Sequence, residues 1–317
     1  MATFPPEHGF AFLSSGNYLK VPARDEKSRQ KFCVAGIAWD GCVTNRPGAR
    51  FGPMAIRRAS QMLCDGIHPH FDTTPVGELC DAGDLLLPNT SLDAMRAKLQ
   101  PQAALLISQH HMVWLGGDHS VTLPLLRAYK QVLGRPLGCV HFDAHCDTWT
   151  DHFGEPSGHG TWTYEALQEG LLIPKCTVQI GIRSSGDKAA REYVNTVGGR
   201  VFTARELRGA ESPAQLKFVT DEIRRRAASA GFPPMYLTFD IDALDPAFAP
   251  GTGTPEPGGL TSAQALTLIE ELSDLPWVGM DCVEVAPPYD HAELTTSAAA
   301  TLTWTYLCGV LAGSKHR

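Results

Sequence analysis

Short apolar runs alternate along the chain with longer segments of helical periodicity. The apolar runs are rich in β-branched and aromatic residues and predict strands. They cover residues 32–39, 112–117, 137–143, 177–184, 200–204, 235–242 and 278–285. The helical segments begin near Ser91, Ser120, Gly160, Ser212 and Thr261, and several open with a Ser or Thr that can cap a helix. Continuous apolar strands separated by helices are typical of a parallel sheet that is covered on both faces.

This alternation predicts an α/β fold, and we assign residues 1–317 to a single domain. A chain of 317 residues is long enough for two domains, but it contains no internal repeat, low-complexity tract or clear linker. Hydrophobic residues make up 43% of the chain and charged residues 19%, which is typical of a globular protein with a sizeable core.

The net charge and the cysteines indicate which partners and which cellular location to expect. The net charge of -7 argues against nucleic acid or an anionic membrane as a partner and favours a small cationic molecule. The N-terminus does not resemble a signal peptide, and no apolar stretch approaches the length of a membrane span. The nine cysteines are scattered and form no CxxC pair, so we expect buried, reduced thiols. Together these features predict a cytoplasmic protein.

Acids and histidines lie at the carboxyl ends of four of the predicted strands. They are Asp118 and His119, then Asp143, His145 and Asp147, then Asp240, Asp242 and Asp245, and finally Glu284. Ligands bind beyond the carboxyl ends of the strands in open α/β sheets, so these side chains are expected to gather at one edge. An Asp after a strand often only caps a turn, and for His119 or Asp242 taken alone such a structural role is the stronger alternative. The whole set favours bound cations, because clustered carboxylates repel one another.

The segment "HFDAHCDTW" carries the densest part of this set. In an extended segment, side chains at every second position share a face, so Asp143, His145 and Asp147 are expected to converge while Cys146 points away. His141 lies one pleat deeper and is expected to support the site rather than to bind an ion.

Five motifs resemble the signature motifs of the ureohydrolase family, the arginases and agmatinases, in the family's order. They are "GGDHS", "FDAHCDT", "GHGT", "TFDIDALDPAFAPGTGTPEPGGLT" and "GMDCVEVAPPYD". The segment 46–60, "RPGARFGPMAIRRAS", resembles the N-terminal region of the same family. The resemblance covers nearly the whole chain. It implies a three-layer α/β/α fold with a mainly parallel eight-stranded sheet, and two Mn²⁺ ions in each subunit.

The resemblance also implies which residues bind the ions. One ion would be bound by His119, Asp143, Asp147 and Asp240, and the other by Asp143, His145, Asp240 and Asp242. Four carboxylates and two imidazoles form an oxygen-rich, hard site, which suits Mn²⁺ better than metals that prefer soft ligands.

The implied reaction is hydrolysis of a guanidino group to urea and an amine. A guanidinium carbon is a poor electrophile, and two metal ions would lower the pKa of a water molecule enough for it to attack. His159 in "GHGT" resembles the histidine that passes a proton to the leaving amine. Glu284 matches the glutamate that pairs with the guanidinium in this family. The alternatives are a loop histidine that bonds the backbone and a strand-end acid that bonds a neighbouring turn.

Members of the family differ in the part of the substrate beyond the guanidino group, its tail, and in the residues that bind it. Arginases carry an Asn shortly after the "DAHxD" motif and another where this chain has Ala286. Here Asp151 and Glu155 follow the motif instead, which suits the ammonium tail of agmatine and predicts putrescine and urea as products of a step in polyamine biosynthesis.

Several alternatives remain open from the sequence. The substrate could instead be 4-guanidinobutyrate, 3-guanidinopropionate or arginine, and the chain could be a noncatalytic metal-binding protein on the same scaffold. The trimers and hexamers of this family lead us to expect a homo-oligomer, with residues 46–60 as a candidate contact.

Overall fold

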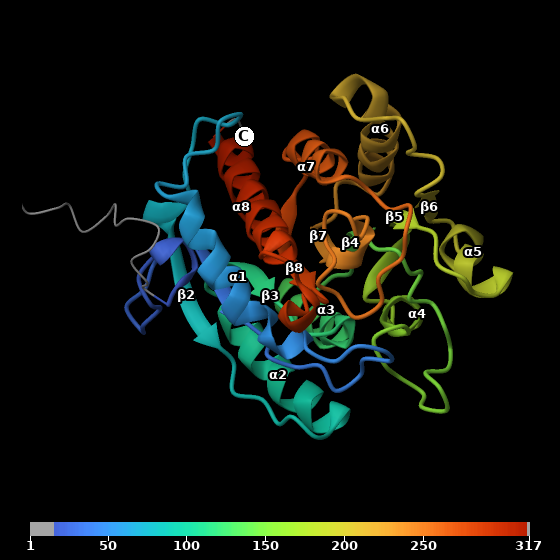
Figure 1. The fold of residues 1–317 in the computed structure, drawn as a ribbon, viewed down its shortest axis with the longest axis horizontal. Coiled ribbons are helices and arrows are strands. Elements are labelled where there is room, and N and C mark those ends of the chain that lie inside the picture. Colours follow the sequence, from blue (N-terminus) through green and yellow to red (C-terminus); the bar gives the residue numbers. More distant parts are fainter. Residues whose placement is uncertain (1–15, 316–317) are drawn as a thin grey trace, which may run out of the picture.

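A sheet of eight strands runs through the centre of the computed structural model, which describes residues 16–315 (Figure 1). The strand order is β2-β1-β3-β8-β7-β4-β5-β6, and all neighbouring strands are parallel. The strands are β1 (Phe32–Gly36), β2 (Leu79–Asp84), β3 (His111–Leu115), β4 (Leu137–Phe142), β5 (Leu172–Ile182), β6 (Arg200–Thr203), β7 (Met235–Asp240) and β8 (Trp277–Val283).

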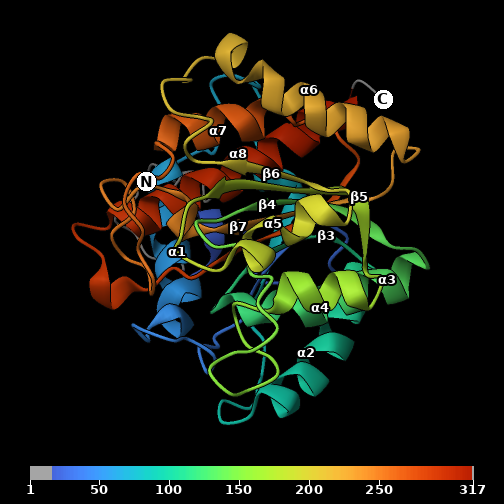
Figure 2. The same ribbon diagram turned by 90° about the vertical axis from the view of Figure 1, so that its right-hand side faces the viewer.

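Helices cover both faces of the sheet, as parallel connections require (Figure 2). They are α1 (Gly52–Ser60), α2 (Leu92–Ile107), α3 (Thr122–Leu133), α4 (Trp162–Gln168), α5 (Lys188–Thr196), α6 (Pro213–Ser229), α7 (Ser262–Glu271) and α8 (Leu294–Lys315). Helices α1, α6, α7 and α8 share one hydrophobic core with the sheet, and α2 to α5 share the other. The expected three-layer α/β/α fold is therefore confirmed.

Burial on both faces explains why the strands are continuously apolar. Along β4, Val140 and Phe142 point into the core beneath α6 to α8, and Leu137 and Cys139 point into the core above α2 to α5. All four side chains are fully buried. An alternating pattern would have placed polar groups in one of these cores.

The sequence pattern identified seven of the eight strands and five of the eight helices that the structure shows in residues 16–315. It missed β2, an edge strand with the polar sequence "LCDAGD", whose second half is not buried. It also missed α1, α5 and α8. Helix α5 is short, and α8 is rich in Thr and Ala without a clear apolar period. The resemblance to the family supplied the correct number of strands, and the sheet is entirely parallel rather than mainly so.

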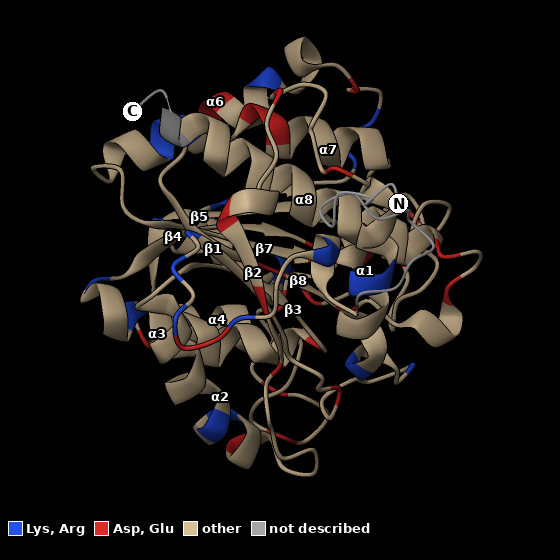
Figure 3. Ribbon diagram, turned by 90° about the vertical axis from the view of Figure 1, so that its left-hand side faces the viewer, with Lys and Arg blue, Asp and Glu red and all other residues tan. Residues whose placement is uncertain are grey.

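Charged residues of both signs lie on the outer helices α2 and α6, as Figure 3 shows. All nine cysteines are free, and all except Cys64 are buried, as predicted. Within residues 16–315, every helix is too short or too polar to cross a lipid bilayer. The cytoplasmic location and the assignment of residues 1–317 to one domain stay predictions.

The chain crosses itself very closely at Gly117, just after β3. A Cβ atom on Gly117 would lie 1.5 Å from the main-chain oxygen of Trp39. The carbonyl group of Gly117 accepts a hydrogen bond from the Glu284 amide at 2.8 Å, so this crossing also holds the end of β8.

We expect Gly117→Ala to lower the free energy of unfolding by about 3 kcal/mol or more. This is the upper end of the usual cost of inserting an extra methyl group into a packed site. Gly77→Ala is the matched control, because a Cβ atom there meets nothing within 4 Å, and it should change stability by less than about 0.5 kcal/mol. Urea denaturation followed by circular dichroism measures both. Equal stability of the two variants would show that the chain can move away from the crossing at no cost.

Candidate metal centre and active site

Four adjacent strands deliver the polar side chains that the sequence singled out. Strands β3, β8, β7 and β4 are neighbours in the sheet, and each carries its acids or histidines at its carboxyl end. At the end of β3, the side chain of Asp118 accepts hydrogen bonds from the amides of Ser120 at 3.0 Å and Cys42 at 2.8 Å. Asp118 therefore caps the turn that begins at His119 and fixes the position of that histidine.

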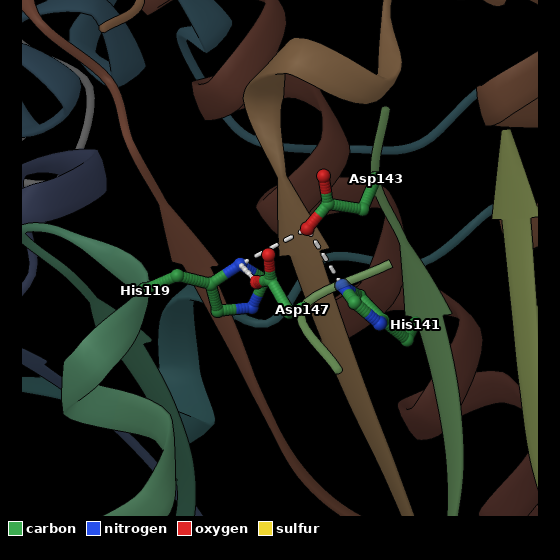
Figure 4. A group of neighbouring side chains, drawn as sticks. All are labelled: His119, His141, Asp143 and Asp147. Carbon is green, nitrogen blue, oxygen red and sulfur yellow. Dashed lines mark hydrogen bonds and ion pairs between the residues drawn. The ribbon is translucent and has the colours of Figure 1, made fainter. Parts of the chain in front are cut away.

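His119 faces three carboxylates through its Nδ1 atom. The distances from Nδ1 are 3.2 Å to Asp143 Oδ2, 3.2 Å to Asp147 Oδ2 and 3.1 Å to Asp240 Oδ2. The other ring nitrogen, Nε2, lies 2.8 Å from the hydroxyl group of Thr238. Part of this group is drawn in Figure 4. With Nε2 held by a hydroxyl, Nδ1 and three carboxylate oxygens converge on one point, which is the first predicted ligand set.

A second convergence lies on the other side of Asp143. His145 Nδ1 is 3.3 Å from Asp143 Oδ1 and 3.1 Å from Asp242 Oδ2. Asp143 thus offers one oxygen to each group, as expected for a bridging carboxylate. Asp240 joins the first group, while its Oδ1 atom accepts a hydrogen bond from the Asp242 amide at 2.9 Å. The bridging role of Asp240 stays a prediction.

The convergence does not arise from an extended strand, and that expectation was wrong. Strand β4 ends at Phe142, and residues 143–147 form an irregular loop in which Asp147 has a φ of +50°. The Asp147 carboxylate is positioned instead by the indole N–H of Trp162, which donates to Oδ2 at 2.7 Å. The amide of Thr163 donates to the Asp147 carbonyl group at 3.0 Å. Contacts with the start of α4 therefore set the position of this predicted ligand.

The electrostatics of the four carboxylates favour cations. Asp143, Asp147, Asp240 and Asp242 are each at most 4% exposed. Burial and the charges of Asp242 and Asp143 raise the pKa of Asp240 well above its usual value. Burial also raises the pKa of Asp143, but hydrogen bonds from histidines outweigh this and hold it well below its usual value. Repulsion of this kind is relieved by divalent ions.

Within residues 16–315, lysine and arginine side chains do not take the place of such ions. The ion pairs of the four carboxylates are with histidines. The neighbouring guanidinium group of Arg183 donates to main-chain carbonyl groups, including that of Asp242 at 2.8 Å. The donor set of carboxylates and imidazoles therefore fits two divalent cations of hard character.

A cavity of about 350 Å³ opens above this cluster. Its lining residues are Thr44, His119, His145, Asp147, Trp149, Asp151, His152, Phe153, His159, Gly160, Asp240 and Thr254. Among the predicted tail-binding residues, Asp151 lines the cavity, whereas Glu155 is exposed and lies outside the lining. Asp151 is also exposed, and its carboxylate accepts a hydrogen bond from the Gly154 amide at 3.1 Å.

His159 stands at the wall of the cavity between two partners. Its Nδ1 atom is 2.9 Å from Glu284 Oε1, and its Nε2 atom is 3.0 Å from the hydroxyl group of Thr44. Burial lowers the pKa of His159, but the charge and hydrogen bond of Glu284 raise it to about 9. A histidine with this pKa carries a proton that it can donate. The hydroxyl groups of Ser157 and Thr161 flank His159 in the loop, and both donate to Glu165 Oε1 at 2.6 Å.

Glu284 lies behind His159 rather than on the lining of the cavity. Its Oε1 atom also accepts a hydrogen bond from the His119 amide at 2.9 Å, and its Oε2 atom is buried without a hydrogen-bond partner in the described structure. The backbone φ of +62° at Glu284 is in the left-handed region, which is uncommon for a residue other than glycine. The chain therefore holds a carboxylate with one free oxygen next to the predicted metal ligands.

Sequence reasoning missed several residues of the site. Thr44 lies in the loop between β1 and α1, 115 positions from His159, and no motif marks it. His152 and Phe153 belong to the same loop as Asp151 and Glu155, and no sequence pattern indicates that they, rather than Glu155, line the cavity.

Comparison with known proteins identifies the family. The sequence profile of the arginase family matches residues 30–309. The chain belongs to the arginase family. An agmatinase of Chromobacterium violaceum is 44% identical over 279 residues, which are 87% of this chain and 82% of that protein. The resemblance to the arginases and agmatinases is therefore confirmed.

Solved structures of this family share the fold. A hypothetical agmatinase from Burkholderia thailandensis superposes with a TM-score of 0.86 at 36% identity, covering 99% of this chain and 97% of that one. Proclavaminate amidino hydrolase from Streptomyces clavuligerus also gives a TM-score of 0.86, at 34% identity, covering 96% of this chain and 99% of that one.

Divalent ions should stabilise the folded protein through the buried carboxylates. With Mn²⁺ at about 100 times its dissociation constant, linkage supplies about 2.7 kcal/mol and raises Tm by about 5 °C. Asp143→Asn should lose this shift, because Asp143 contributes to both groups. Asp221→Asn, at an exposed ion pair, is the matched control and should keep it. Thermal denaturation with Mn²⁺ and with a chelator gives the answer, and a full shift in Asp143→Asn would contradict the assignment.

Proposed function

We propose that the protein hydrolyses agmatine to putrescine and urea with two Mn²⁺ ions. The observation that carries this proposal is the cavity lined by His119, His145, Asp147 and Asp240. Beside it, Asp143 contacts both His119 and His145 and so joins the two groups of histidine and carboxylate side chains. The relatives of this chain named agmatinase, at 41–44% identity, support agmatine as the substrate.

The residues around Asp143 would hold the two ions. The first set is His119, Asp143, Asp147 and Asp240, and the second is Asp143, His145, Asp240 and Asp242. When bound, such ions lower the pKa of water enough for it to attack a guanidino carbon at neutral pH. Oxygen-rich sites with imidazole ligands suit Mn²⁺.

His159 is proposed to deliver the proton that the leaving amine needs. It borders the cavity, carries a proton at neutral pH, and is held by Thr44 and Glu284 on its two ring nitrogens. Proton transfer to the departing nitrogen would let it leave as a neutral amine rather than as an amide anion, which is a very poor leaving group.

Glu284 is proposed to pair with the guanidinium group. Its free Oε2 atom and its Oε1 atom can together accept two N–H groups, which is the geometry of a bidentate pair. In the described structure His159 already donates to Oε1, so the guanidinium would share or replace this contact.

Asp151 is proposed to attract the ammonium tail of agmatine. It is the one tail residue suggested by the sequence that lines the cavity, whereas Glu155 lies outside it. A carboxylate at this position would repel the α-carboxylate of arginine and the carboxylate of 4-guanidinobutyrate. The proposal includes a cytoplasmic location, a homo-oligomer such as a trimer or hexamer, and a role in polyamine biosynthesis.

A substrate panel tests the proposal. The Mn²⁺-loaded protein should release urea from agmatine with kcat/KM more than about tenfold above that for arginine or 4-guanidinobutyrate, a difference of about 1.4 kcal/mol in transition-state stabilisation. A preference for a guanidino acid would overturn the substrate but keep the chemistry. The absence of urea from every guanidino compound would favour a noncatalytic metal-binding protein.

Replacing His159 by Asn should separate proton transfer from metal binding. We expect kcat for agmatine to fall by about 10²–10⁴-fold, the range for loss of a general acid. The Mn²⁺ content and the Mn²⁺-dependent rise in Tm should stay as in the unmodified protein, since His159 faces Thr44 and Glu284 rather than the two ligand groups. An unchanged kcat would limit His159 to a structural role.

Asp151→Asn and Glu155→Gln form a matched pair for the tail. An exposed ion pair is worth up to about 1 kcal/mol, so Asp151→Asn should lower kcat/KM for agmatine by about 2- to 5-fold. It should also improve the rate with 4-guanidinobutyrate relative to agmatine. Glu155→Gln should leave both rates unchanged because Glu155 is outside the cavity. A larger effect of Glu155→Gln than of Asp151→Asn would contradict this account of the tail.

A further inference from the structure

A chain of buried hydrogen bonds leads from β5 to the carboxylate shared by the two ligand groups. The side-chain nitrogen of Gln179 lies 2.6 Å from the Cys146 carbonyl oxygen and 3.0 Å from His141 Nδ1. His141 Nε2 lies 2.7 Å from Asp143 Oδ2. Gln179, His141 and Asp143 are all fully buried.

The Cys146 carbonyl group determines the orientation of the Gln179 amide. A carbonyl oxygen can only accept, so the atom of Gln179 that is 2.6 Å away must be the NH₂ group. The opposite orientation would place two oxygens at that distance in a buried site, where repulsion is strong. The Gln179 nitrogen has two hydrogens, and the second one points to His141 Nδ1.

This orientation determines the direction of the hydrogen bonds of His141. Because Nδ1 accepts from Gln179, it carries no hydrogen, so the N–H group of the ring is at Nε2 and donates to Asp143. Trp162 packs edge-on to His141 with ring centroids 4.9 Å apart, which limits rotation of the imidazole. A nitrogen that carries this hydrogen has no lone pair for a metal ion, although His141 lies close enough to His119, Asp143 and Asp147 to be grouped with them (Figure 4).

Both oxygens of Asp143 are thereby fixed. Oδ2 accepts from His141, and Oδ1 accepts from the main-chain amide of His145 at 2.5 Å. In this position Oδ2 faces His119 Nδ1 and Oδ1 faces His145 Nδ1. The carboxylate plane is held in the orientation that a bridge between two ions needs.

We propose that Gln179 and His141 are positioning residues that hold Asp143 as the bridging carboxylate, and that His141 is not a metal ligand. This proposal rests on the two-ion site of the proposed function. It adds two residues that touch neither ion nor substrate and that act through Asp143.

Binding of Mn²⁺, measured by equilibrium dialysis with metal analysis, tests the role of His141. His141→Phe keeps a ring but removes the N–H donor, and it should weaken Mn²⁺ binding by about 10- to 100-fold while two ions still bind at saturation. Gln179→Met should weaken binding in the same direction by a smaller factor. His111→Phe is the matched control, because His111 pairs with the Tyr306 hydroxyl group at the opposite end of β3, and it should leave Mn²⁺ affinity unchanged.

Each outcome of this experiment has a distinct meaning. Unchanged Mn²⁺ affinity in His141→Phe or in Gln179→Met would overturn the positioning role of that residue. Loss of one ion at saturation in His141→Phe would make His141 a ligand and would also overturn the proposal. If the unmodified protein does not bind two ions, the proposed function itself fails.

Neutron diffraction from crystals of the unmodified, metal-loaded protein tests the proposal without any substitution. It should locate deuterium on His141 Nε2 and none on Nδ1, with the ND₂ group of Gln179 facing Cys146. Deuterium on Nδ1, or a metal ion at Nε2, would overturn the assignment.

Discussion

Mutual repulsion of four buried carboxylates is the constraint on which the site depends. Asp143, Asp147, Asp240 and Asp242 converge from two adjacent strands and the loops that follow them, and their ion pairs are with histidines rather than with lysine or arginine. Such a cluster is costly to bury alone and becomes favourable when divalent cations balance its charge. Binding of divalent cations would relieve this repulsion, so the fold favours their binding. The cavity above the cluster gives a small molecule access to the same place.

The order of the strands in the parallel sheet is enough to bring these side chains close together. Strands β3, β8, β7 and β4 are adjacent, so residues that follow them lie at one edge although they are far apart in the chain. Local hydrogen bonds then orient each side chain. Asp118 caps the turn at His119, Trp162 holds Asp147, and the hydrogen bonds from Gln179 through His141 hold Asp143. Precision at the site comes from these polar contacts, and stability comes from the two apolar cores on either side of the sheet.

The sequence predicted the strands that carry the site, because their apolar runs are buried on both faces, and it predicted their polar ends. It also identified the family. It could not predict the conformation of residues 143–147, since the positive φ of Asp147 depends on contacts with α4. The partnership of Thr44 with His159 and the amide orientation of Gln179 depend on tertiary contacts across more than 30 positions. The sequence pattern did not predict strand β2, because β2 lies at the edge of the sheet and contains two aspartates, so it lacks a continuous apolar run. Glu155 was expected at the substrate tail, but it is exposed and does not line the cavity.

The proposed chemistry depends on two metal ions that Asp143 joins in one site. Anomalous diffraction at the manganese absorption edge, from crystals grown with Mn²⁺, would locate these ions. If Asp143 bridges the ions, two peaks appear roughly 3.5–4 Å apart, the spacing typical of two-metal sites. One should lie between His119 and Asp147 and the other between His145 and Asp242, with an oxygen of Asp143 directed at each. A single peak, or an ion coordinated by His141 in place of Asp143, would contradict this arrangement.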